Sequence, residues 1–402
     1  MAAPLAYPTA LSGPSHHILP RETGRRLVVF FGAKDLADGR YNFLQLGQEL
    51  PESRIFLNNG ANDWYQWGIP GLGDSFAASV DSLRRWRDAV QADEICMIGT
   101  SMGGYAAIQY GAALEARVLA FASDAVLGAP LSRSAAHFTG TGVPTCPDLR
   151  PVVAKSGASV ALILGERDAT DICTAHQLQQ AGPVSVLSLI GADHHVPTYL
   201  SRRSRLGPLM RAFVAGRVLP VQDDAGAAVT APGHALALHA AHLATVAGDW
   251  AGAEAQARLA LAAYPCGEAA EMILGWALLK QDRAAEAADA LARALASQPA
   301  DNETMLRLAA ALRRCGGIAR ARQLYHQILA REPGNHGAHY ALGLTQLQMG
   351  DVAAARQSIL RALRIVPGHR PYLARLKALP VDKGAKAAPV DKALTAAPSA
   401  KP

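Results

Sequence analysis

The sequence predicts an open α/β sheet followed by an all-α solenoid of helical repeats. Over residues 25–219, short runs of Val, Ile and Leu alternate with segments of helical length, a pattern typical of parallel strands covered by helices on both faces. From residue 234 onward, prolines recur at a constant step of 34 residues, which indicates a repeated pair of helices. The length of 402 residues also favours more than one domain, because one core rarely organises more than about 300 residues.

The composition excludes several classes of protein. With 50% hydrophobic and 18% charged residues, the chain can bury a core and is not mainly disordered. The net charge of +6 comes from basic residues interleaved with acidic ones, and no nucleic-acid-binding module accompanies them, so no nucleic-acid partner is expected. The five cysteines form no CxxC pair, and neither a metal nor a cofactor is predicted. Without an apolar run of about 18 residues or a secretory signal, the expected location is the cytoplasm, with no membrane span.

Strands are predicted wherever a short apolar run precedes a turn or a helical segment. Because several of these runs are continuous rather than alternating, we expect a buried, parallel sheet. The predicted strands are Arg26–Phe31, Ser53–Leu57, Glu94–Gly99, Arg117–Phe121, Ser159–Leu164 and Val184–Leu189.

The third of these strands runs into a Gly-x-Ser-x-Gly motif, Gly99 to Gly103, and then into an Ala-rich helix. Such a turn is so tight that its flanking positions need glycine, and it projects the serine hydroxyl above the sheet. The context of strand, turn and helix predicts that Ser101 is a nucleophile. A serine hydroxyl is a weak nucleophile at neutral pH, so the motif also demands a base and a group that orients it.

Candidates for both groups follow later strands, in the order expected of such a site. Asp168 comes directly after the strand that ends at Leu164, at the edge where open α/β sheets keep their sites, and is predicted to be the acid. Asp171 is the alternative acid, although such a second carboxylate often only caps the next helix. After the last strand, one of two adjacent histidines, His194 or His195, is expected to be the base.

The order Ser101, Asp168, His194 resembles the α/β-hydrolase family over residues 25–219. The resemblance implies that fold, a Ser-His-Asp triad and an oxyanion hole. It favours His194, which resembles the single histidine of Gly-x-x-His-x-Val loops, with His195 as the alternative. The oxyanion donors would be the backbone N–H groups of Met102 and of Ala33, where the sequence has Phe-Gly in place of the usual His-Gly.

An aromatic loop lies between the second strand and the Ser101 motif. Trp64, Tyr65 and Trp67 fall within four residues, with Gly and Pro around them. They would line the acyl or sugar side of a substrate pocket, or they would fill a hydrophobic gap, since aromatic side chains serve both purposes.

The repeat region combines the proline step with columns of small residues. Alanine or glycine stands at Ala241, Gly275, Ala309 and Gly343, and a turn column holds Gly248, Asp282, Gly316 and Gly350. Small residues let two helices approach closely, and proline ends the second helix. These columns resemble the tetratricopeptide repeat over residues 234–369, with 370–379 as a capping helix, although the column that usually carries Trp lacks it. The resemblance implies a protein or peptide partner, and the alternative is a dimerisation or purely structural role for the repeats.

The remaining segments are predicted to connect or flank these parts. Residues 1–24 would be an N-terminal extension, 220–233 a linker rich in Gly and Ala, and 380–402 a disordered tail rich in Pro, Ala and Lys. The expected domains are therefore the α/β-hydrolase domain over 25–219 and the repeats over 234–379.

Three functions are predicted from these features. The leading one is a serine hydrolase, in particular a carboxylic-ester hydrolase with an ester or acylated substrate and an acyl-enzyme intermediate; a thioesterase or peptidase would use the same triad. An acyltransferase or deacetylase acting on glycans is an alternative, because the motif and the aromatic loop resemble hydrolase-like proteins of bacterial polysaccharide or glycoprotein biosynthesis. The other alternative is a repeat scaffold for protein interaction that keeps a weakly active or inactive hydrolase fold.

Overall fold

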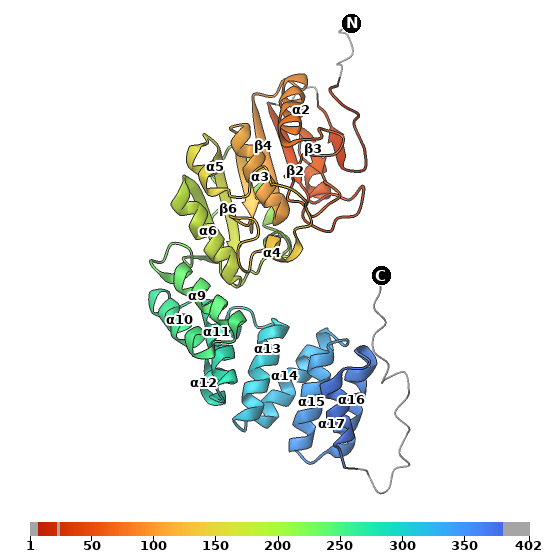
Figure 1. The fold of residues 1–402 in the computed structure, drawn as a ribbon, viewed down its shortest axis with the longest axis vertical. Coiled ribbons are helices and arrows are strands. Elements are labelled where there is room, and N and C mark those ends of the chain that lie inside the picture. The colour runs from red at the N-terminus through yellow and green to blue at the C-terminus, as the bar shows by residue number, and fades with distance from the viewer. Residues whose placement is uncertain (1–6, 22–24, 381–402) are drawn as a thin grey trace. The chain divides into compact units, whose positions relative to one another are not determined.

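A computed structural model describes residues 7–21 and 25–380, whose contacts divide the chain into two compact units. The first unit comprises the residues up to Ala247 together with Gln256–Ala270. The second comprises Gly248–Ala255 and the residues from Glu271 onward. The first unit contains a mixed α/β sheet with its helices, and the second is all-α (Figure 1).

The sheet has eight strands in the order β1-β3-β2-β4-β5-β6-β7-β8. The six strands from β3 to β7 in this order are parallel, and the two edge strands pair antiparallel to their neighbours. The parallel strands are the six predicted ones, and two of them extend one residue further. Their bounds are β2 Arg26–Phe31, β3 Ser53–Leu57, β4 Glu94–Thr100, β5 Arg117–Phe121, β6 Ser159–Gly165 and β7 Val184–Leu189.

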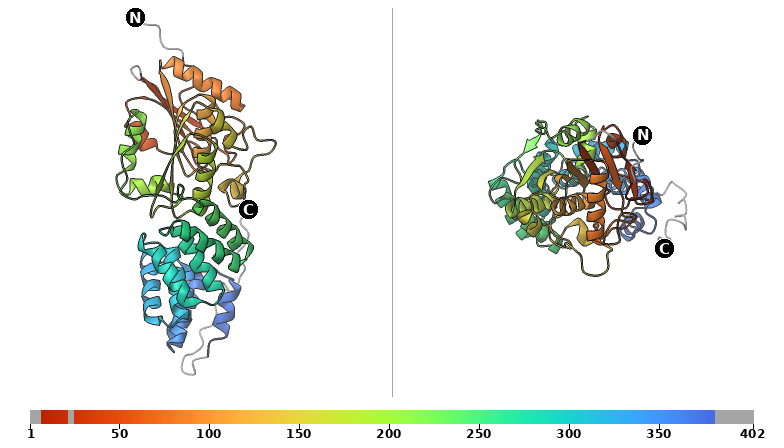
Figure 2. Two further views of the ribbon diagram at one scale, coloured as in Figure 1. Left: turned by 90° about the vertical axis from the view of Figure 1, so that its left-hand side faces the viewer. Right: turned by 90° about the horizontal axis from the view of Figure 1, so that it is seen from above.

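Helices cover both faces of the sheet, as the continuous apolar strands require (Figures 1 and 2). One face carries α2 Phe76–Ala89, α3 Met102–Ala113, α5 Arg150–Lys155 and α6 Ala169–Ala181. The other carries α1 Leu44–Gln48, α7 Val196–Ser201 and α8 Leu206–Val214, and α4 Arg133–His137 follows β5. On this second face Leu209 and Phe213 of α8 pack in one core cluster with Phe30 and Ile98 of the strands.

Both edge strands lie in segments for which the sequence predicts no strand. β1, His16–Leu19, belongs to the predicted N-terminal extension, and β8, Ala225–Gly226, belongs to the predicted linker. The segment after β8 is also packed, since Ala228 and Val229 are buried. The two short strands pair with the edge strands of the parallel sheet, β3 and β7, whose backbone groups would otherwise be unpaired. The predicted tail falls, apart from residue 380, outside the described residues.

The repeat region consists of four helix pairs and a final helix, as predicted. The pairs are α9 His234–Ala247 with α10 Trp250–Ala263, α11 Glu268–Lys280 with α12 Ala284–Ala296, α13 Asn302–Arg314 with α14 Ile318–Arg331, and α15 His336–Gln348 with α16 Val352–Ile365, followed by α17 Arg370–Lys377. The turn column adopts the left-handed backbone conformation that favours glycine, with φ of 76°, 62°, 94° and 82° at Gly248, Asp282, Gly316 and Gly350.

The small-residue column explains how closely the paired helices pack. A Cβ atom placed on Gly275 would lie 2.5 Å from the side chain of Leu291, and one on Gly343 would lie 2.9 Å from Ile359. Ala241 and Ala309, in the same column, are fully buried. Within residues 7–21 and 25–380, no helix has the length and apolar character needed to cross a bilayer.

Candidate active site

Ser101 stands at the tight turn between β4 and α3, with φ 55° and ψ −120°. This conformation is rare for a residue other than glycine, and it is stabilised by the hydrogen bond that the Ser101 N–H donates to the Phe121 carbonyl at 2.8 Å. No side chain fits at either flanking glycine. A Cβ atom on Gly99 would lie 1.9 Å from the carbonyl oxygen of Gly103, and a Cβ atom on Gly103 would lie 2.4 Å from the carbonyl oxygen of Phe31. The turn therefore has the strained geometry that the motif predicts.

Replacing Gly103 by alanine is expected to destabilise the protein by about 1–3 kcal/mol, because the added methyl group meets backbone atoms that cannot rotate away. Urea unfolding followed by circular dichroism would measure the loss. Gly157→Ala is the control, since a Cβ there would first meet the Glu115 side chain at 3.8 Å, an ordinary contact. Equal stability of the two variants would contradict the prediction.

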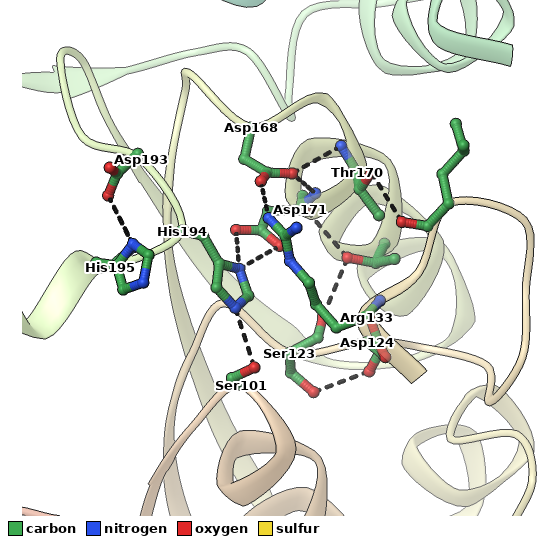
Figure 3. A network of polar contacts seen from close by, with 12 residues as sticks. Ser101, Ser123, Asp124, Arg133, Asp168, Thr170, Asp171, Asp193, His194 and His195 are labelled. Carbon is green, nitrogen blue, oxygen red and sulfur yellow. Dashed lines mark hydrogen bonds and ion pairs between the residues drawn. The ribbon is translucent and has the colours of Figure 1, made fainter. Parts of the chain in front are cut away.

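His194 lies in the loop between β7 and α7 and joins two of the predicted groups (Figure 3). Its Nε2 atom is 3.0 Å from Ser101 Oγ, and its Nδ1 atom is 3.0 and 2.9 Å from the two carboxylate oxygens of Asp171. The side chains of His194 and Asp171 are only 13% and 3% exposed. With the proton on Nδ1 donated to Asp171, Nε2 can accept the proton of the serine hydroxyl.

The two adjacent histidines, His194 and His195, have different surroundings in the structure. The His195 side chain is 76% exposed and faces Asp193, at 3.6 Å, rather than Ser101 (Figure 3). The geometry thus brings His194 to the serine and leaves His195 at the surface.

The prediction that Asp168 orients the histidine is wrong, and the alternative, Asp171, occupies that place. Asp168 is the N-cap of α6: its Oδ1 accepts hydrogen bonds from the N–H groups of Thr170 and Asp171, each at 3.0 Å. Its other carboxylate oxygen forms an ion pair with Arg133. Capping holds Asp168 at the start of the helix, whereas Asp171, in the first turn, is turned toward His194.

Burial and neighbouring charges shift the pKa values of both partners. Burial, reinforced by the charge of Asp168, raises the pKa of the Asp171 carboxyl to about 6, and His194 opposes this rise. Burial lowers the pKa of His194, but the charge of Asp171 and the hydrogen bond to it outweigh burial and bring the pKa above its ordinary value. The pair is thus arranged to stabilise an imidazolium ion.

The two predicted oxyanion donors differ in the structure. Met102 begins α3, where a backbone N–H has no carbonyl partner within the helix. The N–H of Ala33 instead donates to Asn42 Oδ1 at 2.6 Å. The prediction that the Ala33 N–H is available as a donor is therefore wrong in this structure, because the side chain of Asn42, nine residues further along the chain, accepts its hydrogen bond.

A cavity of about 860 Å³ opens beside Ser101 and His194. The predicted aromatic residues are not among its lining residues. Trp64 and Tyr65 are fully buried, and the Tyr65 hydroxyl accepts a hydrogen bond from the Gly32 N–H at 2.9 Å, while Trp67 packs against Phe138. The pocket prediction for these aromatics is wrong, and the alternative, filling of a hydrophobic gap, describes Trp64 and Tyr65. The residues that line the cavity beside Ser101 are Ala33, Lys34, Tyr41, Asn42, Phe43, Leu44, Gln45, Leu46, Thr100, Ser101, Arg133, His137, His194, His195, Pro197, Thr198, Ser201, Arg202 and Leu206.

Asp168, Asp171 and His194 could together hold a metal ion, since one ligand atom of each lies within 4.8 Å of the others. The same atoms are already engaged, however, with His194 Nδ1 bonded to Asp171 and Asp168 bonded to Arg133 and to two backbone N–H groups. The hydrogen bonds therefore fit a proton-transfer site better than a cation site.

Two polar residues of the site were not predicted from the sequence. Arg133 lies in α4 and pairs with Asp168, and Asn42 precedes α1 and accepts from Ala33. Neither belongs to a motif, so only the tertiary fold identifies them. The spacing of the two aspartates is a sequence signal that could have identified Asp171. If Asp168 is the N-cap of a helix, Asp171 lies in the first turn of that helix and its carboxylate is not used for capping.

Comparison with known proteins identifies the repeat region. Two family models of the tetratricopeptide repeat match the chain, over residues 238–302 and 316–379, and repeats of this kind therefore occupy the C-terminal region. Similar solved structures include a MamA protein, at 19% identity over 36% of this chain and 79% of that chain, with a TM-score of 0.33. Another is YrrB, a TPR protein described as having an unusual peptide-binding site, at 18% identity over 45% of this chain and 87% of that chain, with a TM-score of 0.35. No curated protein matches the sequence significantly.

Proposed function

We propose that this chain, whose C-terminal region consists of tetratricopeptide repeats, is a serine hydrolase of carboxylic esters. The proposal is carried by one observation, the hydrogen-bonded chain from Ser101 Oγ through His194 to Asp171. The family models match the repeats, whereas the support for catalysis comes from the geometry around Ser101. The strained turn that presents Ser101 and the cavity beside it support the same proposal.

The proposed reaction passes through an acyl-enzyme. Ser101 Oγ forms a bond to the ester carbonyl carbon as His194 Nε2 takes the serine proton, and Asp171 stabilises the resulting imidazolium. The carbon–oxygen bond to the alcohol then breaks, and His194 gives its proton to the leaving oxygen. Water, activated by His194, next cleaves the acyl–serine ester. The Met102 N–H would stabilise the negative oxygen, as backbone donors at such turns do.

The decisive experiment is labelling with a fluorophosphonate, which reacts selectively with activated serines. The wild-type chain is expected to be labelled and Ser101→Ala to remain unlabelled, because Ser101 is the serine in contact with His194. Ser201→Ala is the matched control, since Ser201 lines the same cavity. A folded wild-type chain that takes up no label would refute the proposal.

The second candidate function is an interaction scaffold in which the sheet unit has little turnover. The match of two tetratricopeptide models favours it, because arrays of such repeats commonly hold a peptide or protein segment. Both functions can coexist in one chain, with the repeats binding a partner and the Ser101 site acting on an ester. The absence of labelling in a folded chain would leave the scaffold as the function.

A further inference from the structure

The turn between α10 and α11 belongs to the same compact unit as the sheet. Residues 256–270 lie in this unit and also within the segment 238–302 that matches the tetratricopeptide repeat. Two side chains near this turn, those of Tyr264 and Glu268, contact residues of the loops that follow β6 and β7. These are the loops that lead to Asp171 and His194.

Glu268 touches both loops at once. Its carboxylate accepts a hydrogen bond from the Gly191 N–H at 3.2 Å, and the same oxygen lies 3.9 Å from the Arg167 guanidinium. The side chains of Glu268 and Arg167 are 5% and 6% exposed, so water screens this interaction weakly. The two loops are also joined directly, because the Arg167 N–H donates to the Ala192 carbonyl at 3.0 Å.

A second buried carboxylate extends this connection. Glu166, next to Arg167, accepts hydrogen bonds from the Tyr264 hydroxyl at 3.0 Å, from Ser188 Oγ at 2.7 Å and from the Ala228 N–H at 2.9 Å. A Cβ atom on Gly226 would lie 2.0 Å from its carboxylate, so a larger residue in β8 would displace that carboxylate. Buried carboxylates with several donors hold their neighbours in one arrangement.

We propose that Glu268 is a positioning residue for the Ser101 site, an inference that rests on the proposed hydrolase function. Gly191 precedes His194 by three residues, and Arg167 precedes Asp171 by four. A displacement of either loop would therefore alter the contacts of 2.9–3.0 Å between His194 and Asp171. Residues 256–270, which lie within the repeat region, then help to hold the loops of the Ser101 site.

The test compares Glu268→Ala and Glu268→Gln in the full chain. Glu268→Ala is expected to lower kcat by up to about 100-fold with little change in KM, because misplacing a reacting group by about 1 Å costs that much. Glu268→Gln should recover part of the loss, since its amide oxygen still accepts from Gly191. Glu303→Ala in α13, where an exposed glutamate pairs with Arg307, is the control and should match the wild type. Wild-type kcat in folded Glu268→Ala would overturn the proposal.

Two further measurements do not depend on turnover. The proton between His194 Nδ1 and Asp171 should give a far-downfield NMR signal in the wild type that weakens or vanishes in Glu268→Ala. Amide exchange at Gly191 should accelerate in the same variant. If the wild type lacks hydrolase activity but both changes occur, the hydrolase proposal fails and the positioning by Glu268 stands; if neither occurs, the positioning fails.

Discussion

His194→Ala is expected to lower the rate of ester hydrolysis by about a million-fold, the loss typical when a triad loses its base. His194 Nε2 lies 3.0 Å from Ser101 Oγ, the position from which it can take the serine proton. Without the imidazole, the serine keeps its proton and the leaving alcohol receives none. Steady-state hydrolysis of an activated phenyl ester would measure kcat and KM for this variant.

His195→Ala serves as the matched control in the same loop. In the described structure its side chain is 76% exposed, pairs with the surface residue Asp193 and lines the cavity, whereas His194 contacts Ser101. The loss of rate should therefore be far smaller than in His194→Ala. Circular dichroism would verify that both variants fold. Loss of activity in His195→Ala with retention in His194→Ala would reverse the assignment of the base.

The parts of the site set by local sequence could be predicted. Gly99, Ser101 and Gly103 stand in a strand–turn–helix context, and the geometry of the turn follows from that context because no side chain fits at the two glycines. The strands were predictable for a similar reason, since continuous apolar runs are buried on both faces of the sheet. The repeat helices follow from a 34-residue step, which a single sequence displays directly.

The parts of the site set by contacts between separate segments of the chain could not be predicted. Ala33 donates to Asn42, and Tyr65 is held by Gly32, so neither the oxyanion donor nor the aromatic pocket follows from the local pattern. β8 lies in a segment whose Gly and Ala content is typical of linkers, yet its pairing with β7 and its contact with Glu166 order it. The choice between two carboxylates three residues apart likewise depends on which one the helix start uses as its cap.

Asp171→Asn is expected to lower kcat by about 10⁴-fold, because an amide cannot stabilise the imidazolium and can favour the wrong tautomer of His194. Asp168→Asn should retain far more activity, since an asparagine still caps α6 and the hydrogen bonds of His194 Nδ1 go to Asp171. Parallel measurements of kcat for the two variants decide between the carboxylates. A greater loss in Asp168→Asn would restore Asp168 as the acid.

The pH dependence of the same variants gives an independent test. Hydrolysis requires neutral His194, so activity should fall as pH drops through the pKa of this residue, which Asp171 brings above its ordinary value of 6.5. Asp171→Asn removes the two largest contributions that raise this pKa. It leaves burial and Arg133, which lower the pKa, and the smaller effect of Asp168, which raises it. The acid limb of kcat/KM should therefore move to lower pH in Asp171→Asn, even though the maximal rate is smaller. If the acid limb of kcat/KM does not move, the titrating group is not the imidazole that is hydrogen-bonded to Asp171.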